Sequence, residues 1–290
     1  MTITFTKMQS AGNDFVLVED SGAIRDYPAF ARFACNRHFG IGSDGVLVLT
    51  RDSRADVGMI MYNPDGSEAE ACGNGLRCLV KYTFDRGFVI TNRMTVATAA
   101  GVRTACIIEA DTTGTIIETS MGYPVFEAGK IPLIPGSTAP GKVLNINAYL
   151  EFPLPVEEYD LRLAIVSMGN PHAVYFTSRP VNEFPLDRIG PLVENAAAFP
   201  QKTNFEVARV LSRGLVEARV WERGAGETLA CGSGASAIGV VSQLSGAVDR
   251  PVAIRLPGGE LEVNWNKAEE VYLKGKAVEV FSGQLSSITF

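Results

Sequence analysis

In the 290-residue chain, Glu68–Gly75 reads EAEACGNG and Glu227–Gly234 reads ETLACGSG, so one short stretch occurs twice. Five of the eight positions are identical at an offset of 159 residues, including both cysteines. A second pair, SAGN at Ser10–Asn13 and SMGN at Ser167–Asn170, matches at an offset of 157 residues. Because the two landmarks recur in the same order at nearly the same spacing, we predict two similarly folded halves that face each other across a cleft.

The remaining pattern is typical of an α+β protein. Short runs rich in β-branched and aromatic residues, such as DFVLVE and GVLVLT, are bounded by Gly, Asp, Asn or Pro and predict many strands. Helix signals are fewer, with one principal helix in each half, which favours α+β over an alternating βαβ order. The expected helices cover Asp26–Asn36, Asn74 to about Arg86, Leu186–Ala198 and Ser233 to about Ser245.

The domain boundaries follow from the repeat. We predict an N-terminal half of residues 1–120 plus about 275–290, and a C-terminal half of residues 121–274. The final strand is expected to return to the first half. Residues 127–160 are rich in Pro and Gly and predict an irregular connection.

The bulk composition is that of an ordinary soluble protein, with 46% hydrophobic and 20% charged residues. The net charge of −6, without runs of like charge, argues against nucleic acid and anionic membranes as partners. The N-terminus lacks the pattern of a signal peptide, and no apolar run reaches the length of a membrane helix, so we expect a cytoplasmic protein.

Five cysteines without a secretion signal predict reduced thiols rather than disulfides. Their spacing and the presence of two histidines argue against structural zinc. Cys35, Cys78 and Cys106 lack flanking glycines and lie in apolar contexts, so we interpret them as core residues. Cys72 and Cys231 differ, because each stands between a turn and a predicted helix and is followed by glycine.

A cysteine at a helix N-terminus can be chemically active. The first helical N–H groups have no partner within the helix, so they can bind a carboxylate with the help of the helix dipole. The same field favours thiolate over thiol. Two such sites suit the inversion of an amino-acid α-carbon, which needs a base on one face and an acid on the other. We therefore predict that Cys72 and Cys231 are the catalytic pair of an amino-acid racemase or epimerase.

Motifs along nearly the whole chain resemble diaminopimelate epimerase: MQSAGNDFVLVE, NRHFGIGSDG, MYNPDGSEAEACGNGLRC, SMGNPHAV, TNFE, ERGAGETLACGSGASA and LPGGELEVNW. The resemblance implies two pseudo-symmetric domains, each a curved, mostly antiparallel sheet wrapped around a central helix. It implies interconversion of LL- and meso-diaminopimelate, on the route to lysine and peptidoglycan precursors, without pyridoxal phosphate, metal or another cofactor. It also implies a homodimer.

The resemblance further implies roles for individual residues. Cys72 and Cys231 match the catalytic cysteines, and His172 and Glu222 match residues that tune or orient them. Helix-start groups that hold the reacting carboxylate are matched by Gly73, Asn74, Gly232 and Ser233. Other substrate-binding positions are matched by Asn13, Asn63, Asn170, Asn204, Glu222 and Arg223.

Two departures from the family pattern lie outside the cysteines. Gly45 stands where some members carry a glutamine that contacts substrate, so Asp44 or a water must serve there. Ser10 stands where glycine is common.

Two alternative functions remain open at this stage. A proline racemase or hydroxyproline epimerase would share the thiol pair, but these enzymes lack the ERGAGE segment and the set of asparagines suited to a substrate with two zwitterionic ends. A thiol-redox binding protein would use the cysteines as a reversible disulfide, which leaves the duplicated anion-binding helix starts without a purpose. A phenazine-type isomerase would share the fold but not the cysteine pair.

Overall fold

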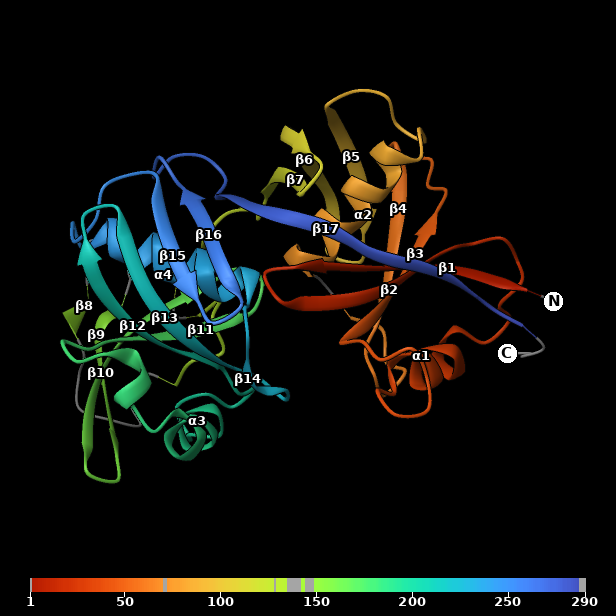
Figure 1. Cartoon of the computed structure of the whole chain (residues 1–290). Helices are drawn as coiled ribbons and strands as arrows, with labels where there is room; N and C mark the ends of the chain where they lie inside the picture. The colour runs from red at the N-terminus through yellow and green to blue at the C-terminus, as the bar shows by residue number, and fades with distance from the viewer. Residues whose placement is uncertain (1, 70–71, 128, 135–141, 144–148, 287–290) are drawn as a thin grey trace. The chain divides into compact units, whose positions relative to one another are not determined.

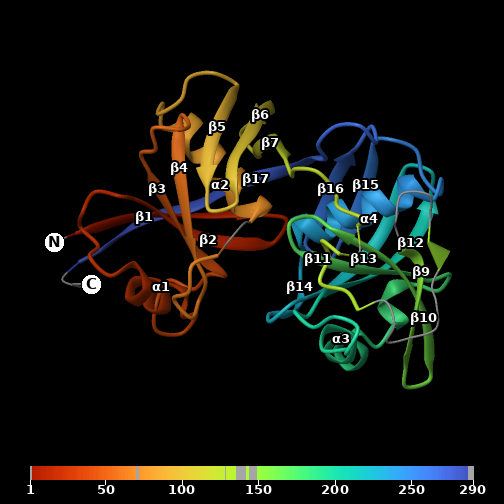
Figure 2. The same ribbon diagram turned by 180° about the vertical axis from the view of Figure 1, so that it is seen from behind.

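The computed structural model describes residues 2–69, 72–127, 129–134, 142–143 and 149–286. It consists of two compact units, each of which contains strands around a central helix (Figures 1 and 2). Unit 1 comprises Met1–Ser120 and Lys274–Phe290, and unit 2 comprises Met121–Leu273. None of the described helices is long and apolar enough to cross a membrane.

The described residues of unit 1 form eight strands and two helices. The strands are β1 (Ile3–Ser10), β2 (Asn13–Glu19), β3 (Gly45–Thr50), β4 (Val57–Tyr62), β5 (Arg93–Thr98), β6 (Gly101–Asp111), β7 (Gly114–Ser120) and β17 (Tyr272–Leu285), which enters the unit at Lys274. The helices are α1 (Tyr27–Cys35) and α2 (Gly73–Asp85). The sheet closes on itself, since β17 pairs with both β1 and β7.

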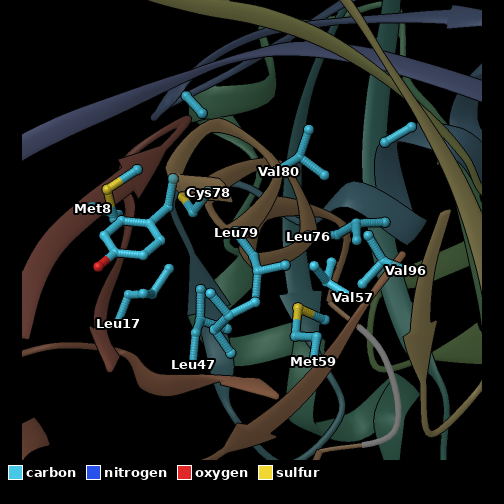
Figure 3. Close-up of a cluster of buried hydrophobic side chains, with 14 of the residues drawn as sticks. Met8, Leu17, Leu47, Val57, Met59, Leu76, Cys78, Leu79, Val80 and Val96 are labelled. Carbon is cyan, nitrogen blue, oxygen red and sulfur yellow. The ribbon is translucent and has the colours of Figure 1, made fainter. Parts of the chain in front are cut away.

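The core of unit 1 follows from the two-residue period of its strands. Leu47 and Leu49 of β3 pack toward α2, whereas Val46 and Val48 belong to the cluster beneath α1. Side chains of successive strand residues point to opposite faces, so the continuous apolar run of β3 is buried on both sides. Figure 3 shows Leu47 and its neighbours gathered around α2.

Unit 2 has the same kinds of element. Its strands are β8 (Lys142–Val143), β9 (Tyr149–Val156), β10 (Tyr159–Ser167), β11 (Pro171–Phe176), β12 (Asn204–Ser212), β13 (Leu215–Glu222), β14 (Gly226–Thr228), β15 (Val252–Leu256) and β16 (Gly259–Asn264). The helices are α3 (Leu186–Glu194), α4 (Gly232–Leu244) and the 3₁₀ turn η1 (Val181–Glu183). Helix α4 packs against β10, β11, β12, β15 and β16.

Strand pairing repeats between the units residue by residue. In unit 1, β2 runs parallel to β3 with Phe15 opposite Gly45, and in unit 2, β11 runs parallel to β12 with His172 opposite Asn204. The next pairs, β3–β4 and β12–β13, are both antiparallel and share their register at an offset of 159 residues. The predicted α+β class with two similar halves is therefore confirmed.

The predicted helices are confirmed with small changes at their ends. Helix α3 ends at Glu194 rather than Ala198, because Asn195 terminates it and donates from Nδ2 to the carbonyl of Pro191 at 2.8 Å. Helix α2 begins at Gly73, one residue before the predicted Asn74, with Cys72 as its N-cap.

The expectation of an irregular connection over residues 127–160 was wrong for its last part. Residues 149–156 form β9, which pairs with β10 along its length and with β8 only at Tyr149 and Glu151. Proline has no N–H to donate to a neighbouring strand, so a strand tolerates it where one edge of the strand is unpaired. Pro153 and Pro155 fit in β9 for this reason. Residues 128, 135–141 and 144–148 of this segment lie outside the described residues.

Candidate active site

Each unit places one cysteine at the start of its central helix. Cys72 is the N-cap of α2, and its Sγ accepts a hydrogen bond from the Gly75 N–H at 3.3 Å. Cys231 is the N-cap of α4, and its Sγ accepts from the Gly234 N–H at 3.4 Å. Sulfur thus takes the capping role that Ser or Asp oxygen usually has, and each thiol lies in the positive field of a 13-residue helix.

Asparagines surround the Cys72 end of α2. The Oδ1 atom of Asn13 lies 3.8 Å from Cys72 Sγ and accepts from Asn74 Nδ2 at 3.2 Å. The Nδ2 atom of Asn13 donates to Asp44 at 2.8 Å, which fixes the orientation of its amide. Asn74 in turn accepts a hydrogen bond from Arg77. The carboxylate of Asp44 therefore orients Asn13 directly.

Arg77 is a buried cation in unit 1 that sequence reasoning missed. Its side chain is 0% exposed, Nε donates to Ser10 Oγ at 3.0 Å, and Nη1 has no hydrogen-bond partner among the described residues. Burial lowers the pKa of this guanidinium to about 10, so it stays charged at neutral pH. Its charge acts on Cys72 and favours the thiolate there. The arginine follows Asn74 by three residues, the spacing of neighbours on a helix face, and this was the available sequence signal.

The surroundings of Cys231 carry the opposite charge. Glu222 and Glu206 both oppose ionisation of this thiol, whereas Ser233, 3.4 Å from Sγ, favours it. Burial is the largest influence, since Cys231 is only 6% exposed, and it raises the pKa of the thiol well above its usual range. The surroundings of Cys231 therefore favour the thiol over the thiolate.

Polar residues of unit 2 form a connected set around Cys231. The ring of His172 lies between Glu206, 2.6 Å from Nδ1, and Asn170, whose Oδ1 is 3.0 Å from Nε2. Asn170 Nδ2 donates to Ser233 Oγ at 3.5 Å. Glu206 lies on β12 and was not among the predicted site residues. The available signal was a charged residue at a position of the apolar run NFEVARV where core residues alternate.

The other predicted residues lie at or beside the ends of strands. Asn63 follows β4 and donates from Nδ2 to Ser67 at 3.0 Å. Glu222 ends β13 and accepts from Thr228 Oγ1 at 2.5 Å. Asn204 is only 2% exposed, and its amide joins the Pro171 carbonyl to the backbone N–H of Arg223, each at 2.9 Å. Asn204 therefore braces the turn that carries the exposed side chain of Arg223.

The remaining cysteines lie away from the helix N-termini. Cys35 and Cys78 are buried in the two cores of unit 1, and Cys106 is half-buried on β6. None of the five cysteines, all of which the structure describes, forms a disulfide. Gly45 begins β3 beneath Phe15, and a Cβ at this position would lie 3.0 Å from the Tyr62 carbonyl oxygen, so the site is too tight for a larger residue without movement.

A salt-bridge network supports the loop that presents Asn13 and Asp44. Asp14 accepts from Arg37 Nη2 at 2.8 Å and pairs with Lys7 at 2.5 Å. Burial alone would raise the pKa of Asp14, but the hydrogen bonds from Arg37 and Lys7 outweigh it and lower the pKa to about 2.

The Asp14→Asn variant is expected to lose about 2 kcal/mol of unfolding free energy at pH 7, the equivalent of its pKa depression. A depressed carboxyl pKa stabilises the fold above the unfolded value near 3.8, so the loss should shrink as pH falls from about 4 to about 2. Urea denaturation across this range measures the difference. Asp160→Asn, which removes an exposed pair with Arg162, should change stability little. A constant difference at every pH would contradict the assignment.

The sequence matches a known protein family over most of its length. The sequence model of the family described as diaminopimelate epimerase matches residues 5–127 and 164–280. A diaminopimelate epimerase from Pelotomaculum thermopropionicum is 42% identical over 283 residues, covering 97% of this chain and 98% of that protein.

Two solved structures share the fold at low sequence identity. A phenazine biosynthesis protein from Bacillus anthracis has a TM-score of 0.70 at 16% identity and covers 98% of this chain and 99% of its own. A hydroxyproline epimerase from Agrobacterium vitis has a TM-score of 0.69 at 15% identity and covers 98% of this chain and 91% of its own. These two likenesses concern the fold alone, whereas the family match and the 42% identity extend over nearly the whole sequence. The chain therefore belongs to the diaminopimelate epimerase family.

Proposed function

We propose that the chain interconverts LL- and meso-diaminopimelate with Cys72 and Cys231 as the two proton-transferring groups, and that it needs neither pyridoxal phosphate nor metal. The observation that carries this proposal is the duplicated cap, in which each thiol accepts a hydrogen bond from the N–H three residues later at the start of a buried helix. Membership in the family supports the identity of the substrate.

The proposed reaction needs the two thiols on opposite faces of one α-carbon. The thiolate of one cysteine removes the α-proton and becomes a thiol, and the electron pair passes into the substrate carboxylate. The thiol of the other cysteine then returns a proton to the opposite face and becomes a thiolate. The high pKa of Cys231 supports the role of acid for this residue in the resting enzyme, and the charge of Arg77 supports the role of base for Cys72.

The carbanionic intermediate needs stabilisation where its charge develops. We propose that the N–H groups of Gly73, Asn74, Gly232 and Ser233, at the starts of α2 and α4, bind the reacting carboxylate. Preorganised donors of this kind are often the largest contribution to catalysis, while a positioned acid or base contributes roughly 10²–10⁴-fold. We therefore expect both the thiols and the helix starts to contribute to the rate enhancement.

The distal end of the substrate is itself an amino acid and needs both donors and acceptors. Asn13, Asn63, Asn170 and Asn204 supply amides, and the exposed guanidinium of Arg223 suits a carboxylate. We propose that these residues, with Glu222, select the long substrate. We also propose that the enzyme is a cytoplasmic homodimer in the synthesis of lysine and peptidoglycan precursors.

The test of the proposed function is proton exchange in D₂O. The reduced protein is incubated with LL-diaminopimelate, and the α-proton and the two stereoisomers are followed by NMR and chiral chromatography. We expect exchange together with formation of the meso isomer. Exchange with L-proline or trans-4-hydroxyproline and none with diaminopimelate would assign the chain to the alternative substrate class. Disulfide formation without exchange on any amino acid would favour a redox protein.

A further inference from the structure

The C-terminal unit contains a buried ionisable pair that the proposed chemistry leaves unexplained. His172 on β11 and Glu206 on β12 are both 0% exposed, and Nδ1 of the ring lies 2.6 Å from Oε1 of the carboxyl group. The second oxygen, Oε2, has no hydrogen-bond partner among the described residues. Burial raises the pKa of Glu206, and the adjacent histidine opposes this rise. Such a pair is expensive to bury, so its presence requires a reason.

The internal duplication supplies a comparison within the same molecule. The strand registers of the two units equate His172 with Phe15 and Glu206 with Leu47. Phe15 and Leu47 are both 0% exposed and belong to the apolar core beneath α2. The same backbone positions are therefore filled by ordinary apolar packing in unit 1, which shows that this architecture does not require a polar pair here.

The carboxyl group of Glu206 also lies against the helix that carries Cys231. A Cβ added to Gly234 would lie 3.0 Å from Glu206 Oε1, and the equivalent Cβ at Gly75 would lie 2.9 Å from a methyl group of Leu47. The absence of a Cβ at both glycines thus leaves room for the side chain beneath the helix start, but only in unit 2 does that side chain carry a carboxyl group. The positive end of α4 favours a negative charge at this place.

We propose that Glu206 is a positioning residue that acts on Cys231 through His172, Asn170 and Ser233. Four contacts make up this series: Glu206 to His172 at 2.6 Å, His172 to Asn170 at 3.0 Å, Asn170 to Ser233 at 3.5 Å and Ser233 to Cys231 at 3.4 Å. The inference deepens the proposed function and rests on it for its catalytic consequence.

The positions of the hydrogens on the His172 ring determine which group donates and which accepts in each later hydrogen bond of the series. The Glu206 carboxylate accepts from Nδ1–H, and His172 then donates from Nε2–H to Asn170 Oδ1. This fixes the Asn170 amide so that Nδ2 donates to the oxygen of Ser233, whose own hydrogen is left for the sulfur of Cys231. Without the negative charge, the glutamine amide of Glu206→Gln can accept from Nδ1–H or donate to Nδ1, so the ring no longer fixes a donor toward Asn170 Oδ1 and the Asn170 amide can turn over. Ser233 then donates to the amide oxygen instead of the sulfur.

The variant Glu206→Gln removes the charge but keeps the size and one acceptor. We expect kcat for diaminopimelate to fall by about 10- to 100-fold because the thiol is misoriented, and KM to change by a smaller factor because Asn170 is one of several proposed substrate contacts. Glu217→Gln is the matched control, since Glu217 lies on neighbouring β13 and pairs with Arg209. The control should keep kcat within twofold. A kcat for Glu206→Gln that also stays within twofold would overturn the proposal.

NMR of the ring nitrogens tests the same step without turnover. The chain has only two histidines, so the ring signals of His172 need to be distinguished only from those of the exposed His38. Because Nε2 of His172 faces an amide oxygen, we expect Nε2 to carry a fixed hydrogen in the parent protein, and in Glu206→Gln we expect the ring hydrogen to be divided between Nδ1 and Nε2. An unchanged ring in Glu206→Gln would overturn the proposal even if activity fell. If the parent protein does not turn over diaminopimelate, this measurement still decides the positioning role separately from the proposed function.

A double variant separates positioning from folding. His172→Phe with Glu206→Leu installs the residues that unit 1 uses at the same positions. We expect a Tm at or above that of the parent protein, since a buried ion pair replaced by apolar residues of similar size is often neutral or stabilising. Activity should fall at least tenfold all the same. A double variant that melts below the parent protein would show that the pair serves stability and would overturn the proposal.

Discussion

Cys72→Ala and Cys231→Ala are each expected to lose at least about a thousandfold in kcat/KM for diaminopimelate. Inversion needs a proton taken from one face and another returned to the opposite face, so neither thiol can substitute for the other. Each variant should still fold, because Cys72 is half-buried and alanine at Cys231 removes only a sulfur atom from the helix cap. Formation of the meso isomer from the LL isomer, followed by chiral chromatography, measures the loss.

Proton exchange gives a sharper version of this prediction. A variant with one thiol can still remove a proton and return it to the same face. In Cys231→Ala we therefore expect slow deuterium incorporation into one stereoisomer without inversion, and in Cys72→Ala incorporation into neither or into the other one.

Cys106→Ala is the matched control, since this half-buried thiol lies on β6 away from the helix N-termini. It should keep kcat/KM within about twofold. Either single variant at Cys72 or Cys231 that retained a tenth of parental activity would contradict the two-thiol assignment.

Most of the fold could be predicted from the sequence because its signals are local or repeated. The helix starts at Cys72 and Cys231 follow from a turn, a glycine and an apolar run within a dozen residues. The strand β9 could not be predicted in this way. Its two prolines argue for a loop, and only the unpaired edge beside β10 makes them acceptable in a strand.

The candidate site was less predictable, because its contacts join residues far apart in the sequence. Asn13 and Asn170 were identified from the repeat. Asp44 orients Asn13, and His172 with Glu206 orients Asn170, but these partners are brought close only by the parallel strand registers. Asn204 was predicted to bind substrate, and the structure adds that its amide is already engaged with Pro171 and Arg223. A polar residue in a sequence motif can thus bind a ligand or hold the residue that does.

The two units place similar thiols in electrostatically opposite surroundings. Arg77 at the fifth position after the N-cap of α2 is a buried cation, whereas its counterpart on α4, Ser236, is neutral and donates to the Gly232 carbonyl. Cys231 instead has Glu206 and Glu222 nearby. The backbone of the helix cap is thus the same in both units. The residues that differ around it favour the thiolate at Cys72 and the thiol at Cys231.

Arg77→Met is therefore expected to lower kcat/KM by about 10²- to 10³-fold. Methionine fills much of the volume, and removal of a buried charge that lacks a carboxylate partner among the described residues should leave Tm nearly unchanged. Two things are lost: the donor that orients the Asn74 amide, and the positive charge that favours the Cys72 thiolate. Cys72 should then react more slowly with iodoacetamide at pH 8, measured by mass spectrometry of its peptide.

The control for Arg77→Met is Lys81→Met, one helical turn further along α2. Lys81 is also a buried cation, but it is committed to Asp85 at 2.8 Å and to Thr115 at 3.1 Å. Its loss should lower Tm and leave both kcat/KM and the alkylation of Cys72 within about twofold. Arg77→Lys keeps the charge but not the forked geometry, so it should restore most of the alkylation rate and only part of the activity. Equal alkylation of Cys72 in the parent protein and in Arg77→Met would show that the buried guanidinium does not set the protonation of this thiol.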